Sequence, residues 1–276
     1  MNKPELYIKA NNPQRNDADD ISDEFEEVIR KMSGRCLDIG SGPGDVVMDF
    51  ILPKLNPNAT IVCSDISEAV VKFGKDTYGG NSRVNFVKLD IQTPNLPRNL
   101  VGRFDHVTSF YCLHWCQDMR QVFDNIYNLL QPGGTSLLVF AANHPSLDAY
   151  KVLAATTCYK PYMTDADRYI PFYQHTDQQR KTLKTLLKEV GFEVCHCSRR
   201  EKSYVFDKLE ELSQYMLAVD SFIDRMPMDL RDEYKKDLVK EVARQQFILN
   251  QNPSNEDIYS VLSVYYLFVV YIRKPL

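Results

Sequence analysis

Three aspartates and a glycine-rich segment stand where buried strands are expected to end. The segment Asp38-Ile39-Gly40-Ser41-Gly42-Pro43-Gly44 follows a short apolar run and precedes a helical pattern. Glycine adopts positive φ at little cost, and a loop that ends at a helix N-terminus favours a negative group such as a carboxylate. Asp65 and Asp90 end the next two apolar runs. A carboxylate at Asp65 could accept both hydroxyls of a ribose, and Asp90 could accept from an adenine amino group.

The spacing of the glycines separates two kinds of nucleotide site. The dinucleotide fingerprint is G-x-G-x-x-G, whereas the third glycine here is Gly44 and position 45 is aspartate. Asp38 stands two residues before the first glycine. One such aspartate alone is more often a solvated or capping residue. Three acids that end consecutive strands beside a glycine loop favour a binding site instead.

Apolar runs and helical patterns alternate around these residues. The expected strands are 35–39, 60–65, 84–90, 104–110 and 135–140, followed by 193–206 and 262–273. Short apolar strands separated by helices indicate an α/β fold with a parallel sheet covered on both faces. We therefore expect a single domain over 1–276, with an N-terminal helical segment at 1–33 over the active site and cap insertions at 141–177 and 207–250.

The composition excludes several classes of protein. The chain has 276 residues, 44% hydrophobic, and a net charge of −4, so binding to nucleic acid, which depends on clustered cations, is disfavoured. Its most apolar stretch, Val261–Ile272, contains three tyrosines and is shorter than the roughly 20 residues of a membrane span. The N-terminus has no apolar core of a signal peptide. With seven scattered cysteines, these features predict a cytoplasmic protein with reduced thiols.

The motifs together resemble class I S-adenosylmethionine-dependent methyltransferases. The resemblance is carried by Leu37 to Gly44, Asp65, Asp90 and Leu130-Gln131-Pro132-Gly133-Gly134. It implies a Rossmann-like, seven-stranded, mostly parallel sheet whose last strand is antiparallel, and S-adenosyl-L-methionine as cofactor. The residues that it places at the cofactor are Asp38, Gly40, Ser41, Gly42, Gly44, Asp65, Ile66, Asp90, Ile91 and Ser109.

A second resemblance concerns the acceptor. The run Phe104-Asp105-His106-Val107-x-Ser109-Phe110-x-x-Leu113-His114-Trp115, with Glu5-Leu6-Tyr7-x-x-x-Asn11-x-x-Gln14 near the N-terminus, is similar to insect juvenile hormone acid methyltransferases. It implies that Gln14 and Trp115 hold the carboxylate of a hydrophobic acid, such as a sesquiterpenoid or fatty acid. The glycine loop has the generic class I form, which leaves a diverged paralogue as an alternative.

The chemistry of the acceptor leaves His114 with two alternative roles. A carboxylic acid has a pKa of about 4–5 and is anionic at neutral pH, so its methylation needs no general base. A hydroxyl or amine acceptor would need one, and His114 could supply it. A non-catalytic module that binds the cofactor or a lipid acid is a third reading.

Two further predictions concern metals and assembly. Cys112-x-His114-x-Cys116 lacks the C-x₂₋₄-C pairs and additional ligands of a tetrahedral zinc site, so we expect no metal. A homodimer is compatible with the sequence.

Overall fold

The computed structural model describes residues 3–251 and 259–276. In this part of the chain eight strands form one sheet, in the order β3-β2-β1-β4-β5-β8-β6, and β7 pairs with β8 beside this path. The strands are β1 (Arg35–Ile39), β2 (Thr60–Asp65), β3 (Val84–Lys88), β4 (Phe104–Phe110), β5 (Leu130–Asn143), β6 (Glu193–Phe206), β7 (Phe247–Gln251) and β8 (Tyr259–Arg273). The first five pair in parallel and β8 runs antiparallel to both neighbours. The predicted α/β fold with an antiparallel last strand is therefore confirmed.

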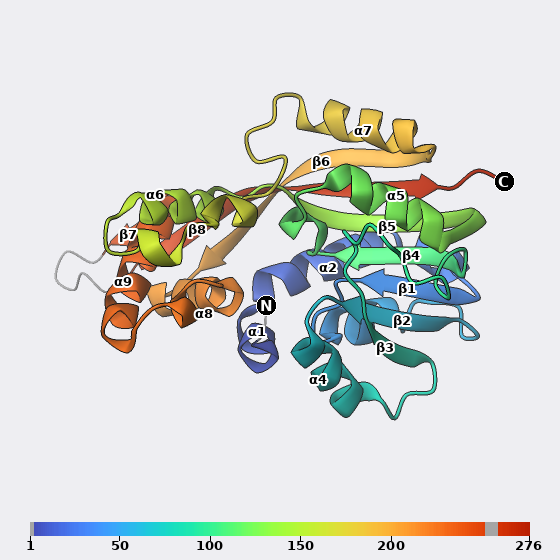
Figure 1. Cartoon of the computed structure of the whole chain (residues 1–276), viewed down its shortest axis with the longest axis horizontal. Helices are drawn as coiled ribbons and strands as arrows, with labels where there is room; N and C mark the ends of the chain where they lie inside the picture. Colours follow the sequence, from blue (N-terminus) through green and yellow to red (C-terminus); the bar gives the residue numbers. More distant parts are fainter. Residues whose placement is uncertain (1–2, 252–258) are drawn as a thin grey trace.

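Helices cover both faces of the sheet and gather at one end of it (Figure 1). The α-helices are α1 (Pro4–Ala10), α2 (Asn12–Glu24), α3 (Glu26–Lys31), α4 (Glu68–Tyr78), α5 (Met119–Leu129), α6 (Ala149–Ala155), α7 (Gln179–Val190), α8 (Leu209–Val219) and α9 (Met228–Arg244). Short π or 3₁₀ turns are η1 (Val47–Ile51), η2 (Leu113–Trp115), η3 (Pro145–Asp148), η4 (Lys160–Tyr162), η5 (Ala166–Tyr169) and η6 (Ile223–Arg225). None of the described helices is long and apolar enough to cross a membrane.

The alternation of side chains along each strand explains the two cores. Neighbouring residues of a strand point to opposite faces, so Leu37 packs with α5 and α7 while Cys36 packs with α2, α3 and η1. Both faces are apolar, which is what a sheet covered on both sides requires. The sheet thus holds the ends of β1, β2 and β4 rigidly at one edge.

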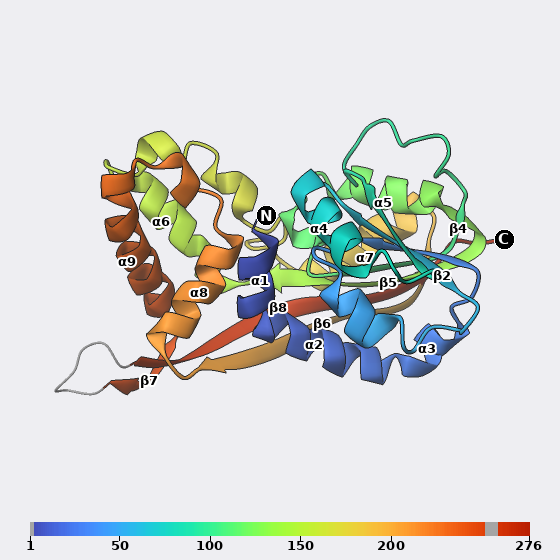
Figure 2. The same cartoon turned by 90° about the horizontal axis from the view of Figure 1, so that it is seen from below.

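Long strands carry the helices beyond the sheet proper. The pairing of β8 with β5 ends at Tyr266, whereas its pairing with β6 continues to Val261. Helices α6, α8 and α9 pack around this extension and share an apolar cluster with η5. In Figure 2 they form a separate lobe, and α1 lies between α8 and α4. We call α6, α8, α9 and the turns between them the cap.

The structure corrects three details of the predicted elements. The sheet has an eighth strand, β7, which is short and pairs only with the extension of β8. The predicted N-terminal helical segment, 1–33, is divided into three helices by breaks at Asn11 and Phe25. The helix after the glycine loop is a wider π-helix, in which Leu52 N–H donates to Val47 O.

Candidate active site

A cavity of about 340 Å³ opens at the carboxyl ends of β1, β2, β3 and β4. Ligands of open α/β sheets bind at this edge. The predicted site residues in its wall are Gly40, Asp65, Ile66, Asp90, Ile91 and Trp115. They come from four segments of the chain, which the fold brings together at this edge of the sheet.

The glycine loop needs glycine for both conformation and space. Gly40 has φ +69° and Gly44 has φ +98°, values that residues with a side chain rarely adopt. A Cβ atom at Gly40 would lie 2.1 Å from Cys112 Sγ, and one at Gly44 would lie 2.9 Å from the Phe86 ring. The loop is therefore seated directly against its neighbours, with its backbone close to the cavity.

Asp65 joins this loop to the start of α4. Gly42 N–H donates to Asp65 Oδ2 at 3.2 Å, and Ser67 N–H donates to Oδ1 at 2.8 Å. Burial raises the pKa of Asp65, and these two hydrogen bonds oppose the rise. The next side chain, Ile66, is apolar yet 58% exposed. A carboxylate beside an accessible apolar side chain is a suitable surface for a ribose with its attached base.

Five predicted cofactor residues do not line this cavity: Asp38, Ser41, Gly42, Gly44 and Ser109. Asp38 is buried behind the loop, where Thr108 Oγ1 donates to its Oδ1 at 2.6 Å. Burial raises the pKa of Asp38 to about 7 despite the hydrogen bond from Thr108.

The two serines are occupied by the backbone. Ser41 Oγ donates to Asp38 O, and Ser109 Oγ donates to Ile39 O at 2.8 Å. In this geometry both hydroxyls hold the loop from behind. Direct contact of these five residues with a cofactor stays a prediction.

The turn η2 brings Trp115 to the cavity wall, whereas His114 beside it is buried and does not line the cavity. The His114 ring is buried, and its centroid lies 4.7 Å from that of Trp115. Burial, reinforced by His144, lowers the pKa of His114 to about 3, so the ring is neutral. Ala141 N–H donates to His114 Nδ1 at 3.5 Å. The remaining ring proton is therefore on Nε2, which is a hydrogen-bond donor.

Gln14 lies on α2 and does not line the 340 Å³ cavity. Its side chain is buried, and its Oε1 has no hydrogen-bond partner within the described residues. The N-terminal helices nevertheless reach the glycine loop. The atom nearest to a Cβ built on Gly42 is Tyr7 Cε1, at 4.0 Å. Helix α1 thus covers the loop from above.

Asp45 fastens α2 beside this loop. Asn11 Nδ2 and Arg15 Nη1 donate to Asp45 Oδ2 at 2.8 and 2.9 Å. Asp45 itself is buried, and it directly follows Gly44. The position of Gln14, between Asn11 and Arg15, is therefore tied to the glycine loop.

Several residues of the wall were not among the predicted site residues. Gln92, Gln117, Arg168 and Tyr169 also line the cavity. Gln117 Nε2 donates at 3.0 Å to the carbonyl oxygens of Arg168 and Ile170, which belong to the insertion after β5. Gln92 Oε1 accepts from Gln117 N–H at 2.8 Å. Only the pattern of strand ends could have indicated Gln92 and Gln117, and nothing local marks Arg168, whereas Tyr169 belongs to the aromatic-rich insertion 141–177.

Comparisons with known proteins agree with this geometry. Residues 37–136 match the model of a methyltransferase domain. The chain is 38% identical to juvenile hormone acid O-methyltransferase of Drosophila melanogaster, over 99% of the chain and 93% of the relative, and 32% identical to that of Bombyx mori, over 99% and 98%. A protein of Bacillus halodurans C-125 described as a methyltransferase superposes with a TM-score of 0.57 at 19% identity, covering 92% of this chain and 98% of its own.

The sheet order and the glycine loop define a class I methyltransferase, an enzyme that uses S-adenosyl-L-methionine. The match over nearly the whole chain specifies it further: the chain belongs to the juvenile hormone acid O-methyltransferase family. The non-catalytic reading is thereby set aside. The residues fit the cofactor, because the loop leaves no room for side chains at Gly40 and Gly44 while Asp65 and Ile66 face the cavity.

Proposed function

We propose that the protein methylates the carboxylate of a hydrophobic acid, such as farnesoic acid or juvenile hormone acid. The observation that carries this proposal is the placement of the only tryptophan. Trp115 lines the same cavity as Asp65 and Ile66, and its indole N–H forms no hydrogen bond to any described residue. An indole N–H is a pure donor, which suits the oxygen of an anionic acceptor beside the cofactor.

The grip on the carboxylate is proposed for Trp115 and Gln14 together. The Gln14 amide is buried on α2, and its oxygen is unpartnered in the described part of the protein. A carboxylate is an acceptor, so the Nε2 group of this amide would donate to it, whereas Oε1, also an acceptor, would not contact it. The two side chains come from opposite ends of the site and would fix the direction of the carboxylate between them.

His114 is proposed as a donor and not as a base. A pKa of about 3 makes its ring a very weak base at neutral pH, and its Nδ1 lone pair faces Ala141 N–H. Its Nε2–H group can orient a carboxylate oxygen. This argues against the alternative of a hydroxyl or amine acceptor that His114 would deprotonate.

The reaction then requires positioning more than proton transfer. When bound, the cofactor supplies an electrophilic methyl group on a sulfonium sulfur. The acceptor is already an anion at neutral pH, and the protein's part is to align it near 3 Å from the methyl carbon and to exclude water. Tyr7 over the loop and Gln117 at the insertion close the two sides of the site.

The cap suits an apolar acceptor chain. Its cluster contains buried aromatic and sulfur-containing side chains, among them Tyr150, Tyr215, Met216 and Phe222. Trp115 packs against this cluster, so the hydrophobic region begins where the carboxylate site ends. Apolar walls with few polar groups are typical of sites for hydrophobic ligands.

We also propose the cytoplasm as the compartment, since all seven cysteines are free thiols. For the oligomeric state, a homodimer stays a prediction.

The proposal is tested by comparing farnesoic acid with farnesol, which has the same chain and ends in a hydroxyl. With labelled S-adenosyl-L-methionine we expect the methyl ester of the acid and no ether from the alcohol. Methylation of farnesol in preference to the acid would overturn the proposal. So would cofactor binding, measured by calorimetry, without ester formation from either acid.

A further inference from the structure

A buried carboxylate on α2, one turn beyond Gln14, connects three walls of the site. Asp17 is 2% exposed. Its Oδ2 accepts hydrogen bonds from the hydroxyls of Tyr111 and, at 2.7 Å, Tyr265. Its Oδ1 lies 3.0 Å from Lys202 Nζ. Three donors thus satisfy one buried charge and link α2 to the end of β4, to β8 and to β6.

Tyr111 gives this linkage a route into the site. It lines the 340 Å³ cavity and follows β4 directly. Its φ of +57° is unfavourable for a residue with a side chain. Such a conformation persists where the surroundings over-determine it. Here Tyr111 N–H donates to Val139 O, and the phenol is held by Asp17.

The segment after Tyr111 carries the proposed acceptor residues. Cys112 lies against Gly40, and η2 with His114 and Trp115 follows at once. The Tyr111 and His114 rings meet edge to face, with centroids 6.0 Å apart. The orientation that Asp17 gives to Tyr111 is therefore passed on to η2 over a few residues.

The second phenol extends the linkage to the cap. The Tyr265 ring is stacked on His144, with centroids 4.9 Å apart and an interplanar angle of 7°. The Tyr215 hydroxyl on α8 lies 3.3 Å from His144 Nε2. Asp17 is therefore connected to η2 through Tyr111 and to α8 of the cap through Tyr265 and His144.

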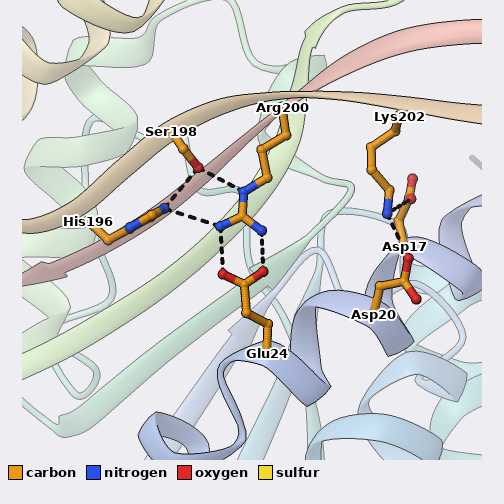
Figure 3. Close-up of polar contacts among 7 residues, drawn as sticks. All are labelled: Asp17, Asp20, Glu24, His196, Ser198, Arg200 and Lys202. Carbon is orange, nitrogen blue, oxygen red and sulfur yellow. Dashed lines mark hydrogen bonds and ion pairs between the residues drawn. The ribbon is translucent and has the colours of Figure 1, made fainter.

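Figure 3 shows that Asp17 belongs to a longer polar contact between α2 and β6. Asp17, Asp20 and Glu24 lie on one face of α2, and Ser198, Arg200 and Lys202 lie on the facing side of β6. The two ends of this contact differ. The side chain of Asp17 is 3% exposed and that of Lys202 is 21% exposed, whereas Glu24 is 50% exposed and the hydrogen bonds of Arg200 go to Glu24, His196 and Ser198, none of which lines the cavity.

We propose that Asp17 is a positioning residue for methyl transfer, which sets the relative placement of Gln14 and Trp115 through the hydroxyls of Tyr111 and Tyr265. This inference rests on the proposed function of the acceptor site. The Asp17–Lys202 end of the contact serves the site, and the Glu24–Arg200 end serves only to fasten α2.

The test compares Asp17→Asn with Arg200→Met, which breaks the other end of the same contact. We expect Asp17→Asn to raise the KM for farnesoic acid at least tenfold while the Kd for S-adenosyl-L-methionine changes less than twofold. Arg200→Met should leave both constants within twofold of the wild type, even if its melting temperature falls by as much as that of Asp17→Asn. Equal effects of the two variants on KM, or an unchanged KM and kcat in Asp17→Asn, would overturn the proposal.

Two milder variants keep the test decisive if Asp17→Asn fails to fold. Tyr111→Phe and Tyr265→Phe each remove one hydroxyl and retain the ring, and we expect each to raise the acid KM threefold or more. The proposal would be overturned if the acid KM were unchanged in both variants.

Hydrogen exchange separates this inference from the proposed function. We expect faster amide exchange at residues 111–116 in Asp17→Asn and not in Arg200→Met, whichever acceptor the enzyme uses. If the wild type esterified no acid but this difference appeared, the acceptor assignment would fail while the positioning role would stand. Unchanged exchange in both variants would contradict the positioning role alone.

Discussion

At the scale of residues, the site is built from side chains whose surroundings decide their chemistry. His114 and Trp115 are adjacent, yet one ring is buried and neutral while the other lines the cavity. Asp65 and Asp38 both end strands, yet one faces the cavity and the other lies behind the loop. Residue type and spacing could identify all four, whereas their different roles follow from burial.

The donor role of His114 predicts that its replacement is tolerated when a donor is retained. We expect His114→Gln to keep at least a tenth of the kcat, because the amide can donate in place of Nε2–H. We expect His114→Phe to lose ~1.5–3 kcal/mol of transition-state binding, because it removes a hydrogen bond to a charged group. The wild-type kcat should show no inflection near pH 6.5, since the pKa of His114 is about 3. Rates measured from pH 5.5 to 9 test this. An inflection in kcat near pH 6.5 that disappears in His114→Gln would show instead that His114 acts as a general base.

Asp65 supports the glycine loop through two backbone hydrogen bonds, and its binding of the cofactor is a prediction. We expect Asp65→Ala to weaken the binding of S-adenosyl-L-methionine by roughly 1–3 kcal/mol through lost hydrogen bonds to a charged group. Calorimetry measures this, with Asp76→Ala on the outer surface of α4 as the matched control. Equal affinity of the two variants would remove Asp65 from the cofactor site.

At the scale of elements, the glycine loop and η2 form one packed unit. Gly40 has φ +69° and lies against Cys112, two residues before His114. The conformation of the glycine loop, which is proposed to bind the cofactor, therefore depends on that of η2, which is proposed to face the acceptor. A substitution in one of them is expected to alter the other.

Gly40→Ala tests this coupling. The added methyl group would collide with Cys112 in a conformation unfavourable to alanine, and we expect about 2–5 kcal/mol lower stability from strain and overpacking together. Gly80→Ala is the control, since nothing lies within 4 Å of its Cβ position and its φ is not positive. Urea unfolding of both variants gives the comparison. A loss in Gly80→Ala as large as in Gly40→Ala would contradict the packing argument.

The elements that could be predicted from sequence are those with local signals. The loop, the strand ends at Asp65 and Asp90, and the Ser67 cap of α4 follow from short motifs. The start of α2 at Asn12 could not be predicted, because its first turns are polar. Nor could β7, whose pairing with β8 is a tertiary contact of a five-residue strand.

At the scale of the whole molecule, function depends on contacts between distant parts of the chain. Asp17 meets Tyr111, Lys202 and Tyr265 only after folding, and Arg168 reaches the cavity from an insertion. No spacing in the sequence indicates these contacts, which is why the strand-end residues of the site were predictable and these long-range partners were not.

Asp38 links the stability of the protein to pH. Its pKa rises to about 7 on folding, from 3.8 in an unperturbed aspartate. Between these pH values the folded state keeps a proton that the unfolded state has lost. The contribution of Asp38 to the free energy of unfolding therefore falls as the pH rises from about 4 to about 7, by up to about 4 kcal/mol, and is constant above.

The variant Asp38→Asn removes this titration. We expect the wild type to lose stability relative to Asp38→Asn between pH 5 and pH 8, measured by urea unfolding at both pH values. The difference between the two proteins isolates Asp38, because the buried histidines are common to both. An identical pH dependence would show that Asp38 is ionised in both states.

The proposed function depends most on the placement of an acceptor carboxylate between the cofactor and Trp115, the only tryptophan. A crystal structure with S-adenosylhomocysteine and farnesoic acid tests it most directly. We expect a carboxylate oxygen within hydrogen-bond distance of the Trp115 indole nitrogen, with the terpenoid chain extending into the cap. A carboxylate bound away from Trp115, or a chain directed out of the cap toward solvent, would contradict it.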